Sequence, residues 1–246
     1  MSDTLVVNEV YLSLQGESTF AGLPCIFVRL TACNLRCSYC DTAYAFTEGN
    51  KRALEEILSE VRRLALAFRA PHSALRIRLP LVELTGGEPL LQPNALPLMR
   101  ALCDDGLTVL IETSGAHDIS TIDPRVRRIM DLKCPSSGEV ERNHWPNIAH
   151  LKATDEVKFV IGTQEDYDWA KEQIVGHNLA DICPLLMSWV QPLAPEQQHR
   201  SLRPVPAGMT PITRRELAEK IIADAVPVRF QLQMHKFIWP VEQRGV

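Results

Sequence analysis

Two hydrophobic patterns alternate along the chain. Short apolar or β-branched runs, typical of buried strands, occupy residues 25–30, 81–84, 108–111, 128–132, 157–161, 185–190 and 228–233. Between them, apolar residues recur every three to four positions, which predicts amphipathic helices packed on a sheet. These positions are Leu54, Ile57, Leu58, Val61, Leu64 and Leu66, then Leu96, Met99 and Leu102, and then Leu217, Ile221 and Ile222.

Strands that alternate with helices are typical of an α/β protein with a parallel sheet. At 246 residues, the chain has the length for a (β/α) barrel or for a partial, shortened version of one. Such barrels place their active residues at the C-terminal ends of the strands. In this sequence, several chemically capable residues directly follow a predicted strand, namely Cys33, 85–88, 112–115, Lys133 and Gln191.

Composition and charge exclude several classes of protein. Hydrophobic residues make up 46% and charged residues 23%, as in ordinary globular proteins. The net charge of −4, without a basic cluster, argues against a nucleic-acid partner. No apolar run approaches the roughly 18 residues of a membrane span, and no Lys or Arg precedes Arg29, so we expect neither a transmembrane helix nor a secretory signal. No linker divides the chain, so we expect a single domain over residues 1–246, with the Pro-rich stretch 191–211 as a surface loop.

A cluster of cysteines is the strongest chemical signal. The chain has seven cysteines, and Cys33, Cys37 and Cys40 form a C-x3-C-x2-C pattern just after a predicted strand. An odd number with such tight spacing is no disulfide framework, so we expect a reducing, cytoplasmic location. Thiolates at this spacing select zinc, copper(I) or an iron-sulfur cluster. Structural zinc sites and electron-transfer 4Fe-4S sites usually have four protein ligands, so three thiols favour a cluster with one open iron. A zinc site and three thiols without a ligand role remain alternatives.

A glycine-rich stretch, Gly86-Gly87-Glu88-Pro89, follows the next predicted strand. Two glycines allow the backbone to approach a ligand closely, and the adjacent carboxylate is suited to an ammonium group. Together with the cysteine spacing, this stretch resembles the radical S-adenosylmethionine (radical SAM) superfamily. The resemblance implies a partial or shortened (β/α) barrel of the radical SAM type. It also implies a 4Fe-4S cluster on Cys33, Cys37 and Cys40 whose fourth iron binds S-adenosylmethionine, which cleaves to a hydrogen-abstracting radical.

Further motifs resemble one family within this superfamily, the 7-carboxy-7-deazaguanine synthases. They span nearly the whole chain, at 7–10 (VNEV), 14–17 (LQGE), 20–22 (FAG), 27–30 (FVRL), 85–89 (TGGEP), 112–115 (ETSG), 131–138 (DLKCPSSG), 191–192 (QP) and 233–236 (QMHK). The resemblance implies that 6-carboxy-5,6,7,8-tetrahydropterin is converted to 7-carboxy-7-deazaguanine with loss of ammonia, in 7-deazapurine (queuosine) biosynthesis. It implies S-adenosylmethionine and Mg²⁺ as cofactors, an external one-electron reductant of the flavodoxin or ferredoxin type, and a homodimer. It also divides the domain into an N-terminal substrate-binding segment, a radical SAM core and a C-terminal extension.

The same resemblance assigns the site residues. Substrate binding falls to Leu14, Gln15, Gly16, Glu17, Arg29, Thr85 and His235. Cofactor binding falls to Tyr39, Cys40, Asp41, Gly87, Glu88, Ser114, Lys133, Ser136 and Gln191. The planar guanidinium of Arg29 suits a pterin carboxylate, and the hydroxyl of Thr42 is a hard oxygen ligand for Mg²⁺. Each assignment has a structural alternative, such as a turn at 15–17 or a loop cap at Thr42.

Two rival functions remain open. A glycyl-radical-enzyme activase shares the cysteine spacing and the Gly-Gly-Glu-Pro stretch but acts on a protein backbone. A non-catalytic iron-sulfur electron carrier would bind no S-adenosylmethionine and would be expected to supply a fourth cluster ligand.

Overall fold

A single nine-stranded sheet organises the fold in the computed structural model, which describes residues 3–68, 78–240 and 243–246. The strand order is β3-β1-β2-β4-β5-β6-β7-β8-β9. The strands are β1 (Thr4–Leu14), β2 (Pro24–Leu30), β3 (Asn50–Ala53), β4 (Leu81–Gly86), β5 (Val109–Thr113), β6 (Arg127–Leu132), β7 (Glu156–Ile161), β8 (Leu185–Trp189) and β9 (Arg229–Gln231).

All seven predicted strands are confirmed, with ends that differ by a few residues. β2 and β4 to β9 run parallel, whereas β1 is antiparallel to both β2 and β3. The hydrophobic pattern does not predict β1 or β3. β1 is mostly half-buried and lacks a continuous apolar run, and β3 is a short edge strand of sequence NKRA.

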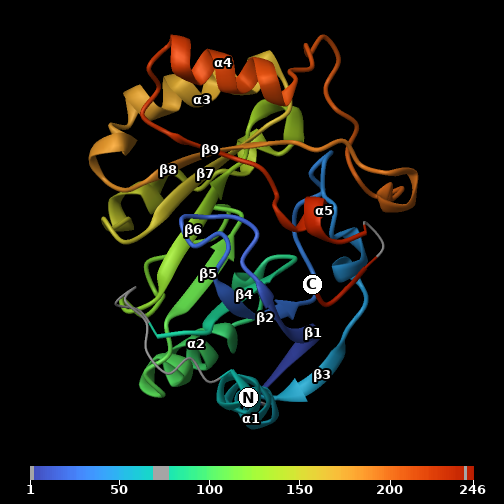
Figure 1. Cartoon of the computed structure of the whole chain (residues 1–246), viewed down its shortest axis with the longest axis vertical. Coiled ribbons are helices and arrows are strands. Elements are labelled where there is room, and N and C mark those ends of the chain that lie inside the picture. Colours follow the sequence, from blue (N-terminus) through green and yellow to red (C-terminus); the bar gives the residue numbers. More distant parts are fainter. Residues whose placement is uncertain (1–2, 69–77, 241–242) are drawn as a thin grey trace.

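The helices are α1 (Leu54–Ala67), α2 (Ala95–Asp104), α3 (Gln164–Gly176), α4 (Arg214–Ala223) and the short α5 (His235–Ile238). The four longer helices lie outside the sheet, and the short α5 lies on its open side, where His235 borders the cavity (Figure 1). α1, α2 and α4 fall on the predicted helical patterns. Leu66 and Ile222 were expected to pack on the sheet, but their exposed fractions are 71% and 79% because their positions lie on the solvent side of α1 and α4. The sequence pattern does not predict α3, which buries Tyr167, Ala170 and Ile174.

A loop bridges the open side of the sheet. In the described chain, β3 and β9 are the two edges and do not pair. The β1–β2 connection crosses to the far strands, where Thr19 N donates to Glu156 Oε2 on β7 at 3.0 Å. Ser18 N donates to Gln231 Oε1 on β9 at 3.1 Å. The expected partial barrel is therefore confirmed as an open, curved sheet whose gap is spanned by a loop.

The stretch 191–211 is irregular, as expected, apart from one short 3-10 turn at Pro195–Gln197. It also contacts the cysteine loop, since Arg203 N donates to Arg36 O at 2.8 Å. No helix in the described ranges is long and apolar enough to cross a membrane. The sequence offers no readable functional motif between residues 47 and 79, and residues 69–77 of that segment lie outside the described residues.

Candidate active site

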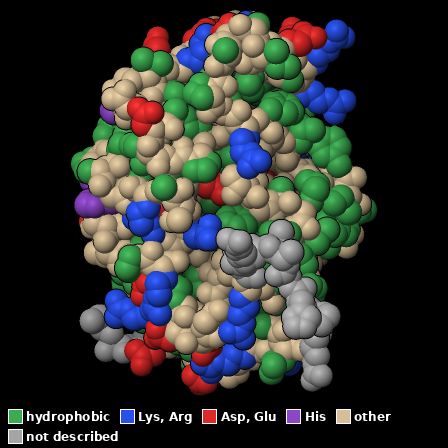
Figure 2. Space-filling model, turned by 60° about the vertical axis from the view of Figure 1, so that its left-hand side comes forward, with side chains coloured by type: hydrophobic (Ala, Val, Ile, Leu, Met, Phe, Trp, Pro, Cys, Tyr) green, Lys and Arg blue, Asp and Glu red, His purple; other side chains and the backbone are tan. Residues whose placement is uncertain are grey.

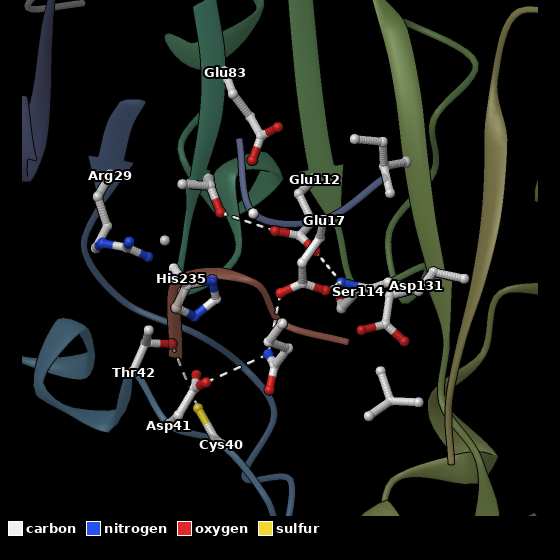
Figure 3. Close-up of a pocket in the computed structure, with 18 of the residues that line it drawn as sticks. Glu17, Arg29, Cys40, Asp41, Thr42, Glu83, Glu112, Ser114, Asp131 and His235 are labelled. Carbon is white, nitrogen blue, oxygen red and sulfur yellow. Dashed lines mark hydrogen bonds and ion pairs between the residues drawn. The ribbon is translucent and has the colours of Figure 1, made fainter. Parts of the chain in front are cut away.

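One cavity opens at the C-terminal ends of the parallel strands. It collects most of the site residues assigned from the sequence: Leu14, Gln15, Gly16, Glu17, Arg29, Cys33, Cys37, Tyr39, Cys40, Asp41, Thr42, Thr85, Gly87, Ser114, Lys133, Gln191 and His235. The parallel register explains part of this convergence, because Arg29 on β2 pairs with Thr85 on β4 and both face the cavity. Figure 3 shows a close-up of this cavity.

The cysteine loop is held from two sides. On the side of β6, Arg36 N donates to Glu139 Oε1 at 2.8 Å and Ser38 N donates to Ser137 O at 3.1 Å. On the other side, the loop packs against the glycine turn, where a Cβ at Gly87 would lie 1.9 Å from Ala32 O. Only glycine allows this approach. The seven cysteines, including Cys33, Cys37 and Cys40 on the cavity lining, are free thiols.

The donor set of this loop fits an iron-sulfur cluster. No three His, Cys, Asp or Glu side chains of the described ranges converge closely enough to hold a single metal ion. A four-iron cluster does not require such convergence, because each thiolate binds a different iron. Burial raises the pKa of the Cys37 thiol to about 12, although Lys133 opposes the rise, and burial also raises the pKa values of Cys33 and Cys40. These thiols therefore need a positively charged centre to stabilise their thiolates.

The wall next to the cysteine loop carries buried polar atoms without partners. Among the described residues, Tyr39 OH, Asp131 Oδ1 and Gln191 Oε1 have no hydrogen-bond partner, and all three residues line the cavity. Lys133 Nζ lies 2.7 Å from Asp131 Oδ2. Buried polar atoms are normally satisfied, so this wall has unused capacity for a polar ligand. S-adenosylmethionine, with an ammonium group, ribose hydroxyls and an adenine amine, supplies donors for these acceptors.

Two residues assigned to cofactor binding are not brought to the cavity lining. Glu88 is fully buried and accepts from Ser114 N at 2.8 Å and Thr113 Oγ1 at 2.9 Å, so its carboxylate is used within the protein rather than facing the cavity. Ser136 N and Oγ both donate to Asp166, at 2.7 Å and 2.5 Å. The sequence motif contains both residues, but the local hydrogen bonds turn their side chains away. Glu88 nevertheless positions Ser114, which lines the cavity.

Arg29 faces the cavity from the opposite wall. Its Nε lies 2.7 Å from Glu9 Oε1 and its Nη2 donates to Tyr11 OH at 2.8 Å. The remaining N–H groups of the guanidinium are available for a bidentate contact with a carboxylate. Glu9 and Tyr11 thus fix the direction of the guanidinium, and neither partner was predicted.

A partly buried network of opposite charges, centred on Lys158, joins the two walls. Lys158 Nζ is 3.1 Å from Glu17 Oε2 and also forms an ion pair with Glu112, to which Thr85 Oγ1 donates at 3.2 Å. Burial opposes ionisation of Glu17, but Lys158, His235 and Gln233 outweigh it and lower its pKa. Lys158 itself is 4% exposed and keeps its charge, because Glu112 and Glu17 raise its pKa against the effect of burial.

The residues near the predicted Mg²⁺ ligand are strongly polar. Thr42 Oγ1 lies 3.7 Å from Cys40 Sγ, and the neighbouring Asp41 carboxylate lies 2.6 Å from Lys236 Nζ. Burial opposes ionisation of Asp41, but Lys236 and then His235 outweigh it and hold its pKa at about 2. Asp41 is therefore a permanent anion beside the Thr42 hydroxyl (Figure 3).

Several cavity residues had no assigned role. These are Tyr11, Glu83, Glu112, Asp131, Lys158 and Gln233. Glu83 and Lys158 interrupt apolar strands, in LVEL and VKFVI, and a charged residue inside a buried strand is a usable signal for a site. Glu112, Asp131 and Gln233 belong to the quoted motifs. Tyr11 gives no comparable signal.

Comparisons with known proteins agree with this geometry. The Radical SAM superfamily model matches residues 28–173. The chain is 41% identical to the 7-carboxy-7-deazaguanine synthase of Chlorobaculum tepidum, covering 98% of this chain and 97% of that one. It is 42% identical to the protein of the same name from Koribacter versatilis, with coverages of 98% and 99%. The solved structure of QueE from Escherichia coli superposes with a TM-score of 0.64 at 22% identity, covering 94% and 95% of the two chains, which supports the fold.

Proposed function

Because the chain belongs to the radical SAM superfamily and, within it, to the 7-carboxy-7-deazaguanine synthase family, we propose that it is a radical SAM lyase acting in 7-deazapurine (queuosine) biosynthesis. The reaction converts 6-carboxy-5,6,7,8-tetrahydropterin to 7-carboxy-7-deazaguanine with loss of ammonia. One observation carries the proposal: a single cavity has three free thiols on one wall and, on another, the half-buried Arg29 guanidinium with N–H groups left free for a ligand. A cluster and a carboxylated substrate thus fit side by side.

Cys33, Cys37 and Cys40 would hold the 4Fe-4S cluster. The cluster, when bound, supplies the electron that cleaves S-adenosylmethionine and so starts hydrogen abstraction from the substrate. S-adenosylmethionine would supply hydrogen-bond partners for the unpartnered polar atoms of Tyr39, Asp131 and Gln191. Further contacts to it would come from Asp41, Gly87, Ser114 and Lys133 on the same cavity lining. Glu88 and Ser136 would contribute by positioning, since their side chains hold Ser114 and the start of α3.

The chain's own residues would orient the substrate. Arg29 would bind the pterin carboxylate with its free N–H groups, held by Glu9 and Tyr11. The segment Leu14–Glu17, Thr85 and His235 would contact the heterocycle. The ion pairs of Lys158 with Glu17 and Glu112 would hold Glu17 and Thr85 in place beside the heterocycle, because Thr85 donates to Glu112.

Mg²⁺ would bind at Thr42. The hydroxyl lies on the cavity lining beside the permanent anion Asp41, and Mg²⁺ often takes only one or two protein ligands with the rest from substrate and water. The substrate carboxylate held by Arg29 is a suitable further ligand. Arg29, Asp41 and Thr42 border the same cavity.

The remaining partners follow from the family. We propose an external one-electron donor of the flavodoxin or ferredoxin type, a homodimer, and a cytoplasmic location without nucleic-acid or membrane partners. Seven free cysteines are consistent with a reducing compartment.

The test is an anaerobic assay of the reconstituted protein with reductant, S-adenosylmethionine, Mg²⁺ and 6-carboxy-5,6,7,8-tetrahydropterin. Mass spectrometry is expected to detect 7-carboxy-7-deazaguanine. Formation of 5′-deoxyadenosine without this product would mean a radical enzyme with another substrate, such as a glycyl-radical-enzyme activase. Formation of neither, with the cluster intact, would favour the electron carrier.

A further inference from the structure

The carboxylates that line the cavity differ in how their charge is balanced. Glu17 and Glu112 share Lys158, Asp131 pairs with Lys133, and Asp41 pairs with Lys236. Among the acidic side chains of the cavity lining, Glu83 is the exception, because it forms no ion pair within the described ranges. Within the part of the chain that the structure describes, the Glu83 side chain has one hydrogen-bond partner, the side-chain amide of Gln15.

The orientation of Gln15 is set by the backbone. Glu17 N donates to Gln15 Oε1 at 3.0 Å, so the amide oxygen is occupied and Gln15 Nε2 is directed to Glu83 Oε2. Glu83 Oε2 is therefore an acceptor in this pair. Both side chains are almost inaccessible, with exposed fractions of 2% for Glu83 and 4% for Gln15, yet both border the cavity.

Glu83 lies on the inner face of the sheet, beneath the rest of the site. It is two residues before Thr85 on β4, so both side chains point to the same face. Thr85 pairs with Arg29 of β2, which places Glu83 about 7 Å along the strand direction from the Arg29 level. Figure 3 shows the Glu83 carboxylate projecting from β4 into the cavity.

An uncompensated carboxylate at this depth lowers the stability of the protein. Burial and the nearby Glu112 raise its pKa well above the usual range, with Lys158 opposing. A group that destabilises the free protein is typical of a binding site, where a ligand supplies the missing donors. The ligand half nearest Glu83 must therefore present N–H groups rather than a further anion.

We propose that Glu83, oriented by Gln15, recognises the adjacent N–H donors of a 2-amino-4-oxopyrimidine ring, so that it selects substrates carrying the exocyclic amine. This inference rests on the proposed function. With the carboxylate end of the substrate at Arg29 and the amine end at Glu83, the two groups fix a fused two-ring heterocycle at both ends. A carboxylate suits this edge because its two oxygens accept from side-by-side donors.

The experiment measures binding to the reconstituted holoenzyme by anaerobic calorimetry, without S-adenosylmethionine. The probes are 6-carboxy-5,6,7,8-tetrahydropterin and its 2-oxo analogue, which lacks the amine. The native protein is expected to prefer the pterin by about 10- to 100-fold, as expected for hydrogen bonds to a charged group. Glu83→Gln should abolish this preference, and Glu83→Asp should retain it with weaker binding.

Glu156→Gln is the matched control, because Glu156 is also 2% exposed, does not border the cavity, and its amide replacement still accepts from Thr19. It should keep the native preference. Glu83→Gln is expected to fold at least as stably as the native protein, since the electrostatic repulsion between Glu83 and Glu112 is removed. An unchanged preference in Glu83→Gln, or its loss in Glu156→Gln as well, would overturn the role of Glu83. If the native protein turned over no pterin at all, the proposed function itself would fail.

Discussion

A Cβ atom at Gly16 would lie 2.6 Å from Nδ1 of His235, although the two residues are far apart in the sequence. The backbones also meet there, since Met234 N donates to Gly16 O at 3.0 Å. The N-terminal motif and the C-terminal His-Lys motif therefore form one wall of the cavity, and a side chain at position 16 would require His235 to move. Figure 3 places His235 beside Arg29 and Thr42 in this wall.

Gly16→Ala should displace His235 from the cavity. The added methyl group meets a ring nitrogen and the His235 backbone, so the C-terminal segment must shift. We expect the KM for the pterin to rise about tenfold while the melting temperature changes by only a few degrees. Steady-state kinetics and thermal unfolding check this, with Gly176→Ala as control because nothing lies within 4 Å of its Cβ position. A pterin KM equal to the native value would contradict the wall contact.

Replacement of Cys33, Cys37 or Cys40 by alanine should remove the cluster and all turnover. The matched control is Cys103→Ala, because Cys103 is a buried free thiol that does not border the cavity. Iron and sulfide content and the visible absorbance of the anaerobically reconstituted protein report on the cluster. Retention of a full cluster in any of the three variants would remove that cysteine from the ligand set.

Arg29→Ala should separate cofactor cleavage from substrate use. The loss of the guanidinium leaves Glu9 and the substrate carboxylate without their cation. We expect the Kd for the pterin to rise at least tenfold and product formation to fall, while 5′-deoxyadenosine still forms. Parallel quantification of 5′-deoxyadenosine and 7-carboxy-7-deazaguanine checks this. Native affinity for the pterin in this variant would show that the carboxylate binds elsewhere.

Tyr39→Phe should stabilise the ligand-free protein and weaken S-adenosylmethionine binding. The Tyr39 hydroxyl is buried without a partner in the described chain, so its removal should raise the free energy of unfolding by about 1 kcal/mol. The matched change Tyr167→Phe should lower it by about 1 kcal/mol, because Tyr167 OH donates to Asp224 at 2.9 Å. Denaturant unfolding and calorimetric titration measure the two effects. The free energy of unfolding must rise in Tyr39→Phe and fall in Tyr167→Phe; a change of the same sign in both variants would contradict the unpartnered Tyr39 hydroxyl.

Acid should unfold the protein partly through Asp41. Its pKa is held at about 2 in the folded chain, below the ordinary value of 3.8, so the stabilisation is complete above about pH 4 and is lost as pH falls to about 2. The loss amounts to about 2 kcal/mol. Asp41→Asn should remove this contribution and flatten the pH dependence of unfolding in that window. Identical acid profiles for the native protein and the variant would refute the pKa depression.

The sequence pattern predicts the seven parallel strands and the edge of the sheet at which the assigned residues meet. Continuous apolar runs between turn residues predict buried strands because burial on both faces requires them, and all seven parallel strands followed. The tight spacing of Cys33, Cys37 and Cys40 places three thiols in one loop whatever the rest of the fold does. The residues after the strands met at one edge because parallel strands end together.

Which side chains face the cavity, and which residues balance their charges, depends on contacts between distant elements. Glu88 belongs to the motif yet turns to Ser114, whereas Lys158 and Glu83 lie within strands yet face the site. Arg29 takes its partner from β1, a strand that the pattern does not predict. Hydrophobic periodicity predicts which face of each helix or strand is buried, and this pattern is local to the element. The partner of a buried charge is chosen by packing between elements far apart in the chain, and no local pattern carries that information.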